Sequence, residues 1–172
     1  MLSAAEEAGQ VRRGYFVDGL GASQFAVIAA VERLRAIARR TDRVAHPQEV
    51  LVLAATDPAN PYGTFLPWPR PADPGVAVRS PRKAGSSVVL IEGELVLYVE
   101  RAGQQLITYT ARSSALTAAA RALAALVRSG RFELGQVEHV DGRPALGSDH
   151  VMVQVLLEAG FRATPKGLRL RR

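Results

Sequence analysis

The chain has 172 residues, of which 48% are hydrophobic and 22% are charged. These values are ordinary for a folded globular protein and exclude wholesale disorder, and the length suits one domain with at most a small appendage. The formal net charge of +6 favours a polyanionic partner, nucleic acid above all, although a basic surface without any partner would give the same charge.

The lack of cysteine and of a long apolar run excludes further classes of protein. The sequence contains no cysteine, which excludes disulfides and thiolate metal sites. No apolar run approaches the roughly 20 residues that span a bilayer, and the acidic first residues lack the layout of a signal peptide. We therefore expect no membrane partner and a cytoplasmic location.

The first elements are typical of the last part of a winged helix. Residues 1–9 predict the end of a helix, and residues 10–17 predict a strand rich in aromatic and β-branched side chains. A glycine turn follows. We therefore expect residues 1–24 to be the tail of a winged-helix-like element and linker, and residues 25–172 to be a barrel-like C-terminal domain.

The middle of the chain predicts one helix and several strands. Residues 26–40 repeat apolar side chains at helical spacing, and residues 49–55 form an apolar strand that should be covered on both faces. Residues 57–75 carry six prolines and predict an ordered or semi-extended loop. Residues 86–109 predict a three-stranded meander, in which Val96 and Tyr98 face away from the other apolar side chains of their strand.

The last third predicts two helices, a strand and a hairpin. Residues 114–129 are a helix, residues 132–140 a strand, and residues 161–170 a short basic hairpin after a third main helix. The expected N-caps of these two helices are Ser113 or Ser114, and Ser148 or Asp149. The predicted architecture is α+β: about six strands in a small mixed or antiparallel barrel-like sheet, with three main helices.

Nucleotide and metal motifs are not recognisable. Gly19-Leu20-Gly21 resembles the start of a dinucleotide fingerprint, but Gln24 stands where the third glycine belongs, and no Walker A sequence occurs. The three histidines, His46, His139 and His150, do not have the spacing of metal ligands. We expect no cofactor, no metal and no ATPase cycle carried by this chain alone.

A carboxylate follows the predicted buried strand directly. Asp57 begins the segment Asp57-Pro58-Ala59-Asn60-Pro61, where a rigid loop could hold an acid in position to orient a water molecule. The same pattern is common in plain turns, because an aspartate bonds readily to the amides of its own loop. Both interpretations remain open on the residues. Asp141 and Asp149 are lesser candidates, and Asp141-Gly142 is most simply a hairpin turn.

Basic side chains gather in four places and are interleaved with aromatic ones. Such a pattern is suited to phosphate contact and base stacking without sequence specificity, and a wing-like hairpin is the best place for backbone contact. The candidate nucleic-acid-binding residues are Arg12, Arg13, Tyr15, Arg79, Arg82, Lys83, Lys166 and Arg169.

Several motifs in this order resemble the C-terminal region of the Lhr (large helicase-related) proteins, bacterial superfamily-2 DNA helicases. The motifs span residues 12–21, 54–63, 66–69, 95–101, 137–142 and 159–169, among them Leu66-Pro67-Trp68-Pro69, Leu95-Val96-Leu97-Tyr98-Val99-Glu100-Arg101 and Val137-Glu138-His139-Val140-Asp141-Gly142. The resemblance implies an accessory domain of an ATP-dependent helicase involved in DNA repair. Its partners would be single-stranded or branched DNA, the upstream helicase domains and, weakly, other copies of itself.

Two alternatives accompany this expectation, so the sequence leaves enzymatic activity open. The Lhr C-terminal region is itself similar to DNA glycosylases of the AlkZ type, which implies excision of uracil with Asp57 as the orienting acid and Tyr62, Phe65 and Trp68 holding the extruded base. The other alternative is a structural or protein–protein module that uses the proline-rich loop.

Overall fold

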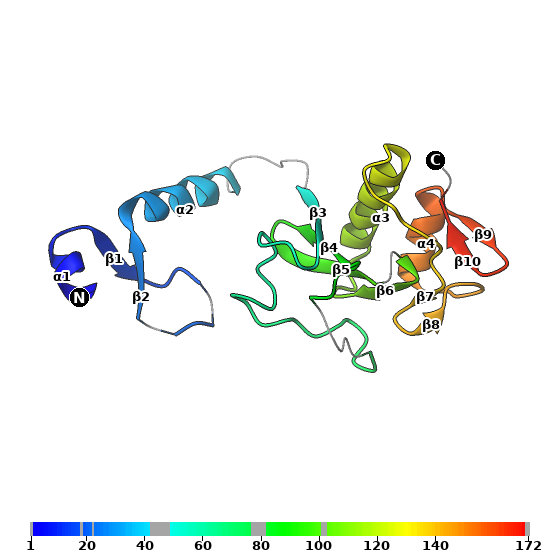
Figure 1. The fold of residues 1–172 in the computed structure, drawn as a ribbon, viewed down its shortest axis with the longest axis horizontal. Coiled ribbons are helices and arrows are strands. Elements are labelled where there is room, and N and C mark those ends of the chain that lie inside the picture. Colours follow the sequence, from blue (N-terminus) through cyan, green and yellow to red (C-terminus); the bar gives the residue numbers. More distant parts are fainter. Residues whose placement is uncertain are drawn as a thin grey trace. The chain divides into compact units, whose positions relative to one another are not determined.

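The computed structural model describes residues 2–17, 19–21, 23–41, 49–76, 82–100 and 103–170. The chain divides into two compact units, Met1–Pro47 and Gln48–Arg172. Figure 1 labels the helices and strands of both units. No helix among the described residues is long and apolar enough to cross a membrane.

The first unit combines two helices with a β-hairpin. Its elements are α1 (Leu2–Glu7), β1 (Val11–Gly14), β2 (Gln24–Val27) and α2 (Ile28–Thr41). β1 and β2 pair antiparallel, with Val11 opposite Val27. The sequence did not predict β2. Because β2 pairs with β1 and continues directly into α2, the expected boundary after residue 24 falls inside this unit.

The second unit is built on a six-stranded sheet in the order β3-β4-β5-β6-β7-β8. Every pairing is antiparallel except that of β6 with β7, so the expected meander of three strands is confirmed. Among the described strands the sheet is open, and the expected barrel is not confirmed. The strands are β3 (Val50–Ala54), β4 (Ser87–Ile91), β5 (Glu94–Glu100), β6 (Gln105–Thr108), β7 (His139–Val140) and β8 (Arg143–Pro144).

Two helices and a terminal hairpin complete the second unit. α3 lies between the parallel strands β6 and β7 in the chain, as a crossover connection requires. The strand expected over residues 132–140 is reduced to the two residues of β7. The remaining elements are α3 (Ser113–Arg128), α4 (Val151–Glu158), β9 (Arg162–Thr164) and β10 (Gly167–Arg169).

Both faces of the sheet are apolar, as expected, and each supports its own hydrophobic cluster. The larger cluster joins the sheet to α3 and α4, and the smaller one joins the opposite face to the loop that follows β3. A β-bulge shifts the register between Val89 and Leu90, so Val96 and Leu97 both belong to the larger cluster. The strict alternation expected for β5 is therefore wrong.

The edge strand and the helix caps also differ from expectation. Leu51 of β3 is 43% exposed, so this strand is not covered on both faces. α3 begins after Arg112 without a side-chain cap, and α4 begins after His150, whose Nδ1 accepts a hydrogen bond from the Met152 amide. The serine and aspartate caps were wrong in both helices.

Candidate nucleic-acid interface

The side chain of Gln24 holds the described residues on both sides of the turn between β1 and β2 through four hydrogen bonds. Its Oε1 accepts hydrogen bonds from the amides of Phe16 and Val17, both at 2.8 Å. Its Nε2 donates to the carbonyl oxygens of Val17 at 2.8 Å and Gly21 at 2.9 Å. One primary amide has two acceptor positions and two donors, so Gln24 uses its full hydrogen-bonding capacity on this loop. We call residues 15–17, 19–21 and 23 the wing loop.

The wing loop presents apolar side chains to solvent. The Tyr15 side chain is 79% exposed and Leu20 is 57% exposed. A surface hollow of about 390 Å³ is lined by Tyr15, Phe16, Val17, Gly19 and Gly21. An exposed aromatic ring on a fixed loop is a platform on which an unpaired base can stack.

The two arginines of β1 have different surroundings. Arg13 forms an ion pair with Glu6 at 3.2 Å, and its guanidinium lies 5.1 Å from the centre of the Phe25 ring. Arg13 therefore stabilises the unit through a salt bridge and a cation–π contact. Arg12 is exposed and makes no ion pair with any described residue, which leaves its guanidinium available for a phosphate.

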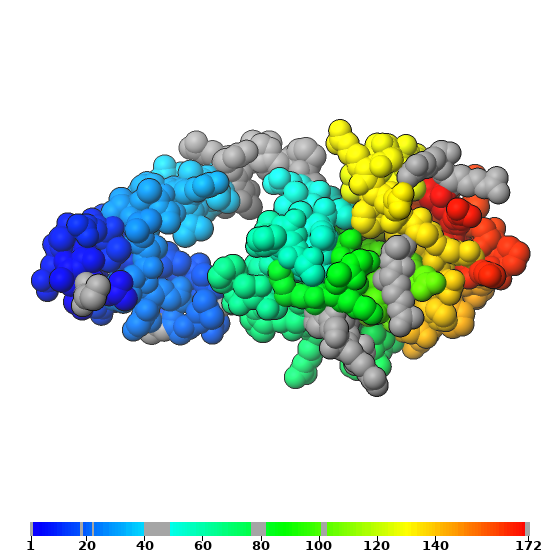
Figure 2. All heavy atoms as spheres, in the orientation of Figure 1, coloured from blue at the N-terminus to red at the C-terminus, as the bar shows by residue number. Residues whose placement is uncertain are grey.

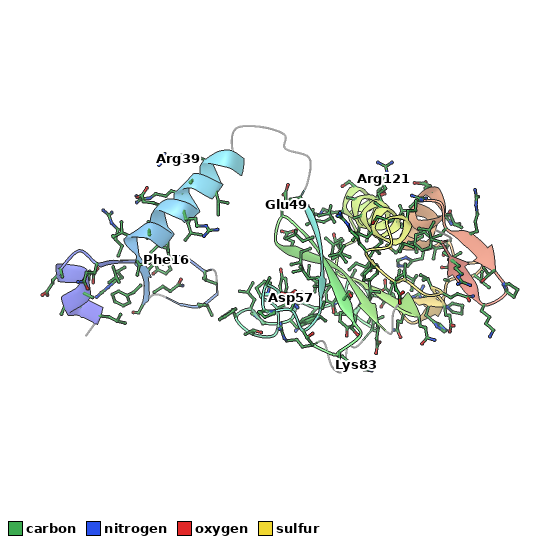
Figure 3. All side chains as sticks on the ribbon, turned by 45° about the horizontal axis from the view of Figure 1, so that its top comes forward. Phe16, Arg39, Glu49, Asp57, Lys83 and Arg121 are labelled. Atoms are coloured by element: carbon green, nitrogen blue, oxygen red, sulfur yellow. The ribbon has the colours of Figure 1, made fainter. Side chains whose placement is uncertain are left out.

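Asp57 lies in a turn at the start of the loop after β3, where Figure 3 labels it. Its Oδ1 accepts a hydrogen bond from the Ala59 amide at 2.8 Å, the local pattern of an aspartate turn. Asp57 does not line the hollow beside the wing loop or the second hollow, which lies next to Asp141. The geometry agrees with the turn interpretation of this residue.

Arg82 stabilises this loop by donating hydrogen bonds to its backbone carbonyl groups. Its Nη1 donates to the carbonyl oxygens of Asn60 and Tyr62, both at 3.0 Å. Its Nη2 donates to those of Thr56 and Asp57, both at 3.1 Å. Four carbonyl groups therefore converge on one guanidinium, and Arg82 has a structural place in the loop.

Lys83 and Arg79 were expected to contact nucleic acid together with Arg82. Lys83 lies 3.7 Å from Glu100 in a partly exposed ion pair, and Arg79 lies outside the described residues. Lys166 and Arg169 are exposed on the terminal hairpin of β9 and β10. The expected residues that the structure describes thus lie on the hairpin of the first unit, or just after its first strand, and on two separate segments of the second.

The aromatic side chains expected to hold a base are mostly part of the fold. Trp68 makes edge-on contacts with Tyr62, Tyr98 and Tyr109, with ring centres 5.9 to 6.4 Å apart. Its Nε1 donates to the hydroxyl of Tyr109 at 2.6 Å. Phe65 is different, because its side chain is 71% exposed. Tyr62 and Trp68 therefore attach the proline-rich loop to the sheet.

Burial in this cluster raises the pKa of Tyr109 to about 12, against the opposing effect of the hydrogen bond from Trp68. An unfolded tyrosine loses its proton near pH 10. We therefore expect the free energy of unfolding to fall as the pH rises from about 10 to about 12, because the unfolded chain then binds fewer protons than the folded one. Urea titrations of the wild type and of Tyr109→Phe, at about pH 8 and about pH 11, measure this fall.

The Tyr109→Phe variant should lose less stability over this interval than the wild type. A residual fall is expected, because burial raises the pKa of Tyr98 as well. Equal losses in the two proteins would contradict the assignment to Tyr109.

Asp141 occupies the expected hairpin turn between β7 and β8, yet its carboxylate is buried. The residue has φ 49° and is 4% exposed. Its Oδ1 accepts from the Thr108 amide at 2.8 Å, and its Oδ2 accepts from the Thr108 hydroxyl at 2.6 Å and lies 3.1 Å from Nε2 of His150. Since Nδ1 of His150 accepts from the Met152 amide, the ring proton is assigned to Nε2. This carboxylate joins β6, the β7–β8 turn and the start of α4.

A second surface hollow, of about 430 Å³, lies beside Asp141 and is lined in part by Asp73, Gln105 and Arg143. Nη2 of Arg143 lies 3.4 Å from Oδ2 of Asp73. Asp149 is exposed at the start of α4. Among the described residues, no group of three histidines, cysteines, aspartates or glutamates could hold a metal ion.

Comparison with known proteins relates both units to one family. Residues 1–46 match the family model of the winged-helix domain of the large helicase-related protein. A Mycolicibacterium smegmatis protein named Lhr helicase/probable uracil glycosylase is 45% identical over 99% of this chain. An Escherichia coli protein named Lhr helicase/uracil glycosylase is 36% identical over 98% of it. The chain covers only 12% and 11% of these relatives.

Proposed function

We propose that this chain, which belongs to the Lhr family and corresponds to its C-terminal region, is an accessory region that binds single-stranded nucleic acid through the wing loop. The observation that carries the proposal is Tyr15, 79% exposed on a loop that Gln24 fixes with four hydrogen bonds. In the parent protein, upstream helicase domains would supply the ATP-driven motor, and the region would act in the cytoplasm, in DNA repair, on single-stranded or branched DNA.

The proposed contact has two parts. Arg12 neutralises a backbone phosphate, and the Tyr15 ring stacks on an unpaired base at the hollow. Because Gln24 orders the loop before binding, little conformational entropy is lost when the strand arrives. Stacking and phosphate contact do not read base edges, so binding should tolerate any sequence.

Replacing Tyr15 by alanine should raise the dissociation constant for a fluorescent single-stranded oligonucleotide roughly tenfold, since stacking on one aromatic side chain contributes about 1–3 kcal/mol. Fluorescence anisotropy over a series of salt concentrations measures both the affinity and its salt dependence.

Phe65→Ala is the matched control, because Phe65 is also an exposed aromatic residue, at 71%, and lies outside the wing loop. Its affinity should equal that of the wild type. Equal losses in the two variants, or an affinity that does not change with salt, would reject the wing loop as the binding site.

The same unit also exposes apolar side chains on α2, including Leu34 at 45%. We propose that this face packs against neighbouring domains of the parent protein, and that the isolated chain associates weakly with itself at high concentration.

A second candidate function is excision of uracil from DNA, which is favoured by the names of both relatives. We propose Asp57 as the acid that orients the attacking water, with Asp141 beside its hollow as the alternative carboxylate. Incubation of the pure protein with uracil-containing DNA, followed by alkaline cleavage, detects abasic sites.

The Asp57→Asn variant keeps an oxygen that can accept from the Ala59 amide while removing the charge. Loss of excision in this variant, with the unfolding midpoint unchanged, is the result expected of a catalytic acid. Full excision by Asp57→Asn would leave Asp57 as a turn residue only.

A further inference from the structure

The terminal hairpin places two arginines directly opposite each other. Arg162 of β9 pairs with Arg169 of β10 in the antiparallel register, so both side chains leave the same face of the hairpin. Both residues are exposed, and neither forms an ion pair with a carboxylate of a described residue. Like charges that face each other across strands destabilise a hairpin.

The hairpin is anchored too firmly to relieve this repulsion by shifting its register. Leu168 is 2% exposed and exchanges two backbone hydrogen bonds with Val137, both of 2.8 Å. On the other strand, the Thr164 hydroxyl accepts from Gln136 at 2.6 Å and donates to the Gly167 carbonyl at 2.9 Å. Phe161, just before β9, is fully buried. The backbone positions of Arg162 and Arg169 are therefore held opposite each other by the core beneath the hairpin.

The turn of the hairpin adds a third cation. Lys166 lies between β9 and β10 and is exposed. The neighbouring Arg128, by contrast, is engaged, because its Nη2 donates to the Ala159 carbonyl at 2.7 Å. In Figure 2 the red and orange atoms of this C-terminal segment are open to solvent in the second unit. An anion that approaches this face meets cations without a neutralising partner among the described residues.

We infer that Arg162 and Arg169 form a site for a phosphate group, with Lys166 as an accessory cation. A phosphate placed between two guanidinium groups removes their repulsion and accepts paired hydrogen bonds from each planar fork. The physiological source is a phosphate of the DNA backbone, a choice that rests on the proposed function. The site is distinct from the wing loop and gives the second unit its own contact with the strand.

The test is the variant Arg162→Glu, which converts the cross-strand repulsion into an attraction. The melting temperature at low salt should therefore rise above that of the wild type. Inorganic pyrophosphate should raise the melting temperature of the wild type and should leave that of this variant unchanged. The affinity for a single-stranded oligonucleotide should fall roughly tenfold, and the slope of log affinity against log salt should decrease by about 1.

Arg121→Glu is the matched control. Arg121 is exposed on α3, and Figure 3 shows its side chain pointing away from the sheet. The substitution changes the net charge equally but leaves the arginine pair intact. It should keep the stabilisation by pyrophosphate and lower the DNA affinity much less.

The outcomes separate this site from the proposed function. Equal losses of DNA affinity in Arg162→Glu and Arg121→Glu, or equal stabilisation of wild type and Arg162→Glu by pyrophosphate, overturn the site. If Tyr15→Ala weakens DNA binding while Arg162→Glu does not, the site fails and the wing loop stands. If pyrophosphate stabilises the wild type and Arg121→Glu but not Arg162→Glu, and no protein binds DNA, the anion site stands and the proposed function fails.

Discussion

Replacement of Asp141 by alanine should lower the free energy of unfolding of the second unit by about 3 kcal/mol or more. The change leaves three donors without their acceptor: the amide and hydroxyl of Thr108, and Nε2 of His150. Each buried donor that loses its partner costs about 1–3 kcal/mol, and the two groups of Thr108 are buried. Urea unfolding followed by far-ultraviolet circular dichroism measures the loss.

Two further substitutions distinguish the contribution of the Asp141 carboxylate to stability from that of the backbone conformation at this turn. Asp141 has φ 49°, a conformation that asparagine and glycine adopt more readily than alanine. Asp141→Gly removes the hydrogen bonds without steric strain and should still lose most of the stability. Asp141→Asn keeps one acceptor oxygen and should lose less. A glycine variant as stable as the wild type would show that the hydrogen bonds contribute little.

Replacement of Gly167 by alanine should destabilise the second unit by roughly 3–5 kcal/mol, because backbone strain and overpacking both act there. The glycine has φ 148°, and a Cβ atom there would lie 2.1 Å from the carbonyl oxygen of Val137. The same carbonyl accepts the hydrogen bond from the Leu168 amide, so the clash cannot be relieved without breaking the anchor of the hairpin. Chemical unfolding of the purified variant gives the magnitude.

Gly130→Ala is the control for the backbone contribution alone. Gly130 has φ 71°, and its added Cβ would meet no atom within 4 Å. We expect a loss of about 1 kcal/mol there. Similar losses at Gly130 and Gly167 would mean that the contact with Val137 relaxes freely.

The elements with strong apolar periodicity could be predicted from the sequence, but the register between their strands could not. The meander and α3 follow from side-chain spacing, and the glycine turns follow from their φ preference. The bulge that turns both Val96 and Leu97 to one face depends on the register between β4 and β5, which no local pattern records. The His150 cap was missed for a related reason, since histidine is not among the preferred capping residues.

For the candidate site, residue type located the exposed groups but not their roles. Arg12 and Tyr15 were predicted from charge and aromaticity. Gln24 was seen only as a turn residue, because its partners are backbone groups of residues up to eight positions away. Arg82 was expected to contact phosphate, since a sequence does not reveal that four carbonyl groups surround a guanidinium.

The attachment of the proline-rich loop to the sheet can be monitored by tryptophan fluorescence. Trp68 is the only tryptophan in the sequence, and its indole lies between that loop and the sheet. Its emission should therefore shift when the proline-rich loop separates from the sheet, and no other tryptophan contributes to the signal. Separation of this loop can be followed by the wavelength of maximum tryptophan emission, without any added label.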